Sequence, residues 1–141
     1  MSRARIAAVL ATVVCVLSPV AAYATAGLSV TAASARRGAD QATVRLSGSY
    51  SCGPFSSGLP DRGVIDMEVT QVQGSVTLRA IGYLEPQVCD GSEQRYSVTL
   101  TEVVARRFRL GAAAWSASGY VEGDTGLQHV FVPPAPITIV R

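Results

Sequence analysis

Residues 42–52 alternate between apolar or small residues and polar residues along the whole stretch. Such a two-residue period is typical of a β-strand with one buried face and one solvated face. The stretch ends in a cysteine, so the predicted strand can be tied to a later segment by a disulfide. Its buried side would carry Ala42, Val44, Leu46, Gly48, Tyr50 and Cys52, and its solvated side Thr43, Arg45, Ser47, Ser49 and Ser51.

Further segments show the same alternation and are separated by residues that favour turns. The last segment contains three prolines, which lack a backbone donor and therefore predict an edge strand or a split one. No helical period and no internal repeat occurs after the first 26 residues. The additional predicted strands cover residues 28–32, 65–71, 76–80, 96–101, 113–119 and 127–140.

About seven short strands with frequent turns predict an all-β fold, an immunoglobulin-like antiparallel two-sheet sandwich with one disulfide. If consecutive strands run up and down, Cys52 and Cys89 lie at the same end of the domain. In an immunoglobulin-like order the second and fifth strands are neighbours. The disulfide would then join two loops at the end of that strand pair.

Residues 1–26 have the pattern of a secretory signal peptide. Two arginines precede an apolar core at residues 6–16, and small residues offer cleavage after Ala24 or Ala26. An uncleaved membrane anchor is the alternative, because the apolar stretch approaches the length of a bilayer span. With cleavage, residues 27–141 would be one secreted extracellular β-domain without a membrane span.

Cys52 and Cys89 are the cysteines outside this leader, and two cysteines in an exported chain are expected to form a disulfide. The bond would close a loop of 37 positions, which is worth about 3–4 kcal/mol of stability in the chain-entropy model. Free thiols or pairing between two chains are the alternatives.

The charge balance excludes one class of partner. Without the two arginines of the leader, the remaining arginines equal the 10 acidic residues, and the chain contains neither lysine nor asparagine. The mature domain therefore lacks a general basic excess for nucleic acid, and it has no N-glycosylation sequon.

Four short motifs point to one group of proteins: Gly-Ser-Tyr-Ser-Cys at 48–52, Cys-Asp-Gly at 89–91, Tyr-Ser-Val at 96–98 and Phe-Arg-Leu-Gly-Ala at 108–112. Together they resemble small secreted immunoglobulin-like β-sandwich proteins of actinobacteria, a group without an established function. The resemblance implies a fold and a compartment. The chain departs from true immunoglobulin domains, because no Trp lies between its two cysteines.

Residues capable of catalysis are sparse. His129 is the only histidine, and no Gly-x-Ser-x-Gly elbow accompanies it. Asp66 and Glu68 share one strand face, which we interpret as a solvated sheet surface. Zinc needs at least three good ligands, which one His and two bonded cysteines cannot supply. We therefore predict a non-enzymatic protein without a metal or cofactor.

Charged residues gather at the two ends of the predicted domain. Acidic residues in loops at the disulfide end offer a binding surface and, as an alternative, a weak Ca²⁺ site. Arginines at the opposite end offer contacts for an anionic glycan, wall polymer or membrane surface. The acidic loop residues are Asp61, Glu85, Asp90, Glu122 and Asp124, and the candidate anion contacts are Arg106, Arg107 and Arg109.

The leading hypothesis is a secreted binding or interaction module that uses the disulfide-end loops, with Phe55 and Leu59 as apolar contacts. Its expected partner is a cell-surface glycan or another protein. The alternative is a carrier of a small apolar ligand between the sheets, in a cleft lined by Ala113, Ala117 and Gly119. A hydrolase that uses His129 as its base ranks third.

Overall fold

The computed structural model describes residues 27–141, so the predicted leader lies outside the described residues. In this part of the chain no helix is long and apolar enough to cross a membrane. The described strands are β1 (Ser29–Arg37), β2 (Thr43–Ser51), β3 (Arg62–Gln73), β4 (Val76–Leu84), β5 (Gln94–Glu102), β6 (Gly111–Gly123) and β7 (Gly126–Val140).

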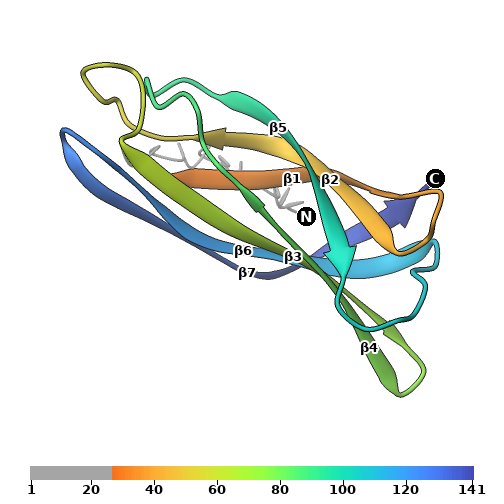
Figure 1. Cartoon of the computed structure of the whole chain (residues 1–141). Helices are drawn as coiled ribbons and strands as arrows, with labels where there is room; N and C mark the ends of the chain where they lie inside the picture. Colours follow the sequence, from red (N-terminus) through yellow and green to blue (C-terminus); the bar gives the residue numbers. More distant parts are fainter. Residues whose placement is uncertain (1–26) are drawn as a thin grey trace, which may run out of the picture.

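The strands form one closed barrel in the order β1-β2-β5-β4-β3-β6-β7 (Figure 1). Neighbours are antiparallel except β1 and β7, which run parallel. The all-β class and the disulfide are confirmed. The prediction of an immunoglobulin-like two-sheet sandwich was wrong, because a single sheet closes on itself.

Two short ladders close the barrel. β4 and β5 pair only around Ile81 and Thr101, and β1 and β7 pair only around Ala35 and Ile139. The other neighbouring strands pair over most of their lengths. Inward and outward residues alternate in the same way in a sandwich and in a barrel, so the hydrophobic pattern does not reveal these two seams.

Apolar side chains fill the inside of the barrel. In β2 the predicted alternation is confirmed for Val44, Leu46 and Tyr50, which are buried, and the predicted neighbour of this strand, β5, lies beside it. The disulfide joins Cys52 to Cys89, also as predicted. The largest fully buried side chains include Phe108, Leu46, Ile65, Met67, Leu78, Leu100 and Ile139.

β7 is one unbroken strand despite its prolines. Its ladder with β6 shifts register between Trp115 and Ala117, and Pro133 and Pro134 have no partner in that ladder. The other side of β7 pairs with β1 only near its carboxyl end. Pro133 and Pro134 therefore lie where few backbone donors are needed, which is how a strand tolerates them, whereas Pro136 is paired with Ala114.

Gln71 is a buried polar residue that fixes the loop between β5 and β6. Its amide nitrogen donates to the Arg109 carbonyl (2.9 Å) and to the Ala112 carbonyl (3.3 Å). Its oxygen accepts from the Arg109 backbone N–H (2.9 Å) and from the side chain of Gln73 (2.7 Å). The loop backbone is thus held by side chains at the end of β3.

We expect the phenol of Tyr96 to titrate far above free tyrosine. Burial raises its pKa to about 12, and its hydroxyl donates to the Thr31 carbonyl (2.9 Å). Because the folded pKa lies above the unfolded value, this contribution to stability is complete below about pH 10 and is lost as the pH rises toward 12.

Alkaline absorbance titration should show one late phenol that is missing in Tyr96→Phe. In chemical denaturation, the fall in stability between about pH 10 and 12 should be smaller in that variant. A Tyr96 phenol that titrates near pH 10 in the folded protein would contradict the assignment.

Candidate functional site

A broad depression lies on the outside of the barrel, across the outward faces of β3 to β7. It has a volume of about 940 Å³. Across the sheet, one row of side chains crosses β7, β6, β3 and β4 in turn. Three strand spacings separate the ends of this row, so it is about 14 Å wide. The residues of the row are Phe131, Ser118, Asp66 and Tyr83.

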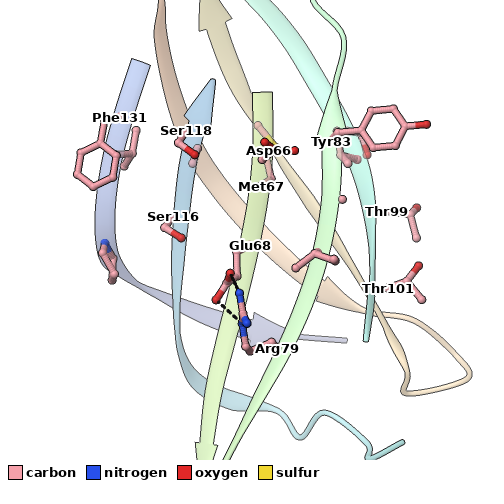
Figure 2. Close-up of a pocket in the computed structure, with 17 residues that line it drawn as sticks. Asp66, Met67, Glu68, Arg79, Tyr83, Thr99, Thr101, Ser116, Ser118 and Phe131 are labelled. Carbon is pink, nitrogen blue, oxygen red and sulfur yellow. Dashed lines mark hydrogen bonds and ion pairs between the residues drawn. The ribbon is translucent and has the colours of Figure 1, made fainter. Parts of the chain in front are cut away.

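Aromatic side chains stand at the two sides of the depression. Phe131 is 77% exposed and Tyr83 is 63% exposed, and Ile81 adds a further apolar group that is 48% exposed. Figure 2 shows Phe131 on one side and Tyr83 on the other, with β3 between them. Exposed aromatic groups that face one hollow are a common feature of ligand-binding surfaces.

The floor between these rings is polar. Glu68 forms a two-point ion pair with Arg79, with Nε–Oε1 and Nη2–Oε2 distances of 3.0 and 2.6 Å (Figure 2). Hydrogen bonding to Glu68 raises the pKa of Arg79 above its already high ordinary value, so the guanidinium remains charged. Within residues 27–141, the exposed Asp66 carboxylate has no side-chain hydrogen bond or salt bridge. Ser118 lies directly opposite it in the β3–β6 ladder, and the hydroxyl groups of Ser97, Thr99, Thr101 and Ser116 line other parts of the depression.

The disulfide-end loops use several of the predicted binding residues to hold themselves together. Phe55 is buried at 4% exposure, and its ring packs so closely on Gly123 that a Cβ there would clash. Hydrogen bonds from Ser56 hold the pKa of Asp124 below its usual value. Glu122 is ion-paired with Arg62. Phe55 is therefore a core residue rather than a surface contact.

The remaining loop residues are more open. Leu59 is 55% exposed and lines a hollow of about 430 Å³ with Asp61 and Glu85. Asp90 accepts hydrogen bonds from the Ser92 hydroxyl and backbone, which lower its pKa. In residues 27–141 no group of three or more His, Cys, Asp or Glu side chains could hold a metal ion.

Arg106, Arg107 and Arg109 are exposed in the loop between β5 and β6. Together with Phe108 they line a hollow of about 330 Å³. Their backbone is anchored, because the Gln73 side chain donates to the Arg107 carbonyl (3.1 Å) and Gln71 bonds Arg109. The structure thus places these candidate anion contacts together.

Within residues 27–141, the residues considered for a carrier or a hydrolase do not line one cleft together, since Ala117 alone among them borders the depression. Ala117 is buried in the core, and the backbone at Gly119 touches the Val64 carbonyl so closely that a Cβ would lie 2.2 Å from it. A cleft between two sheets needs two sheets, whereas the described strands form one barrel. His129 is exposed beside Tyr120, with ring centroids 6.4 Å apart.

The residues that define the depression, Tyr83, Phe131 and Arg79, were not predicted from the sequence. The alternation of inward and outward positions could have revealed two of them. Tyr83 and Phe131 fall on the solvated side of their strands, where large apolar groups are unexpected. Comparisons with protein-family models, curated proteins and solved structures gave no match. The resemblance to secreted actinobacterial proteins stays a prediction, and the function must be inferred from the surface.

Proposed function

We propose that this protein is an exported, non-enzymatic binding module that holds a sugar chain in the depression outside β3 to β7. The observation that carries the proposal is the row from Phe131 to Tyr83, in which two exposed aromatic groups flank an unpaired carboxylate and a hydroxyl. The leader pattern and the disulfide support export.

A sugar chain matches the chemistry of this row. The flat C–H faces of sugar rings can pack on Phe131 and Tyr83, which present large rigid apolar surfaces. Sugar hydroxyls can donate to Asp66, whose carboxylate accepts up to four hydrogen bonds. The residues that line the depression come from five neighbouring strands, β7, β6, β3, β4 and β5, so a linear chain can lie across them. A compact apolar ligand would leave the carboxylate desolvated and unpaired.

Truncation of either aromatic side chain should weaken sugar binding. For Phe131→Ala or Tyr83→Ala we expect about a tenfold loss of affinity, because the ring removed is a flat apolar contact. Asp66→Asn should cause a smaller loss, since an amide oxygen still accepts. Calorimetric titration with a panel of soluble neutral oligosaccharides, at fixed salt, measures these changes.

Val72→Ala is the matched control. Val72 is 71% exposed on β3 and lies outside the depression, so its truncation should change neither affinity nor stability appreciably. Oligosaccharides that all fail to bind the native protein would contradict the proposal. So would binding that Phe131→Ala, Tyr83→Ala and Asp66→Asn all leave unchanged, because the chain would then occupy another surface.

A further inference from the structure

A second, smaller groove lies at the end of the barrel opposite the disulfide. Its volume is about 320 Å³, and four of its lining residues are arginines. The others are one glycine and two threonines, so no acidic side chain lines it. The arginines are Arg36, Arg37, Arg45 and Arg141.

Closure of the barrel brings these arginines together. The antiparallel ladder of β1 and β2 places Arg36 opposite Arg45. The parallel seam of β1 and β7 places Arg36 opposite Val140, so Arg141 follows directly beside it. Residues far apart in the sequence therefore share one groove, and none of the four is among the candidate anion contacts Arg106, Arg107 and Arg109.

The guanidinium groups of the groove are oriented but not neutralised by side chains. Arg36 Nη1 donates to the Arg141 carbonyl (3.3 Å), and Arg37 Nη1 donates to the Phe108 carbonyl (3.2 Å). The salt bridges within residues 27–141 involve other arginines. A guanidinium has five N–H donors, so most remain available.

Asp40 is the acidic residue closest in sequence to Arg36 and Arg37, and its carboxylate is directed into its own turn. One oxygen accepts from the Thr43 hydroxyl (2.8 Å) and from the backbone of Thr43 and Ala42 (both 3.1 Å). These hydrogen bonds hold the pKa of Asp40 below its usual value. The turn thereby shapes the groove without placing an acidic side chain among the groove-lining residues.

We propose that the arginine groove binds phosphate groups carried by the sugar chain that occupies the depression. Guanidinium forks match the geometry of phosphate, to which they donate paired hydrogen bonds. The phosphate site is inferred from the residues of the groove alone. Only the inference that one ligand occupies both surfaces rests on the proposed function.

Continuity between the two surfaces supports a shared ligand. Thr99 lines both the depression and the arginine groove, and it lies directly opposite Arg45 in the β2–β5 ladder. A linear polymer that leaves the aromatic row can therefore pass over β5 and reach the arginines. The phosphate groups are expected at the arginines and not in the middle of the depression, because the Asp66 carboxylate would repel an anion there.

Tripolyphosphate is the probe for the phosphate site. At low salt the native protein should bind it, and the double variant Arg36→Gln/Arg45→Gln should bind about tenfold or more weakly. The control double variant Arg62→Gln/Arg95→Gln removes the same charge from exposed positions outside the groove, and it should lose less than about threefold. Equal losses in both variants, or no binding at low salt, would overturn the proposal.

A phosphorylated oligosaccharide and its phosphatase-treated form test the shared ligand. The phosphorylated form should bind about tenfold tighter, and Arg36→Gln/Arg45→Gln should abolish this gain while Phe131→Ala weakens both forms. If both forms bind equally, the inference fails and the proposed function stands. If tripolyphosphate binds but neither sugar does, the proposed function fails together with the shared ligand. Binding to phosphatidylglycerol vesicles without binding to tripolyphosphate would assign the groove to a membrane surface and overturn the proposal.

Discussion

Replacement of both cysteines, Cys52→Ser with Cys89→Ser, should lower the free energy of unfolding by about 3–4 kcal/mol. The two residues are 37 positions apart, so the bond removes a large loop-closure entropy from the unfolded chain. For a domain of this size we expect the melting temperature to fall by roughly 10–15 °C, measured by calorimetry without reductant.

The double variant should nevertheless reach the native fold, because backbone hydrogen bonds also join the two loops. The Gly91 amide donates to the Cys52 carbonyl (2.9 Å), and the Phe55 amide donates to the Cys89 carbonyl (2.9 Å). Reductant should destabilise the native protein and leave the variant unchanged. A loss below about 1 kcal/mol would show that the bond constrains the unfolded state little.

The alternation of residues 42–52 predicted the buried face of β2, and the two cysteines outside the leader predicted the disulfide. Local periodicity and cysteine pairing are both visible in the chain. The neighbour β5 was predicted from an immunoglobulin-like strand order, and the barrel contains the same strand pair although it is not a sandwich. Closure of the barrel depends on two seams of two residue pairs each, around Ile81 and Ala35. No periodic signal distinguishes such a short ladder from a free edge.

The candidate site was predicted less well for a related reason. Charged loop residues were predicted as binding residues because loops commonly carry function, yet Asp90 stabilises its own turn and Asp124 joins its turn to the backbone of Ser56 in another loop. The depression instead combines Phe131 with Tyr83 from strands that are neighbours only through two others. Phe131 and Tyr83 are brought to one surface by the strand order of the barrel, and local sequence patterns do not reveal that order.

Leu110 is 41% exposed, although it lies only two residues from Phe108. Phe108 alone enters the core, where it is fully buried. Phe108 and Leu110 each follow an arginine in the sequence, yet the first is buried and the second is exposed. The register of a loop is set by specific contacts, here those of Gln71 with Arg109, and alternation does not predict it.

Phe108→Ala should cost about 3–5 kcal/mol of stability, because it leaves a cavity under the loop between β5 and β6. The Phe108 backbone is part of the same anchor: its amide donates to the Gln41 carbonyl (2.9 Å), and its carbonyl accepts from Arg37 (3.2 Å). Loss of the ring should therefore loosen one arginine of the groove as well as the core.

Leu110→Ala is the matched control for this truncation, and its expected cost is below about 1 kcal/mol because the side chain is already partly solvated. Urea denaturation measures both variants, and Phe108→Leu, with a smaller loss, provides a folded protein if the alanine variant does not fold. Similar losses for Phe108→Ala and Leu110→Ala would contradict the assignment. In the folded leucine variant, tripolyphosphate affinity should fall further than in Leu110→Ala, because Arg37 is held by the carbonyl that the Phe108 ring positions.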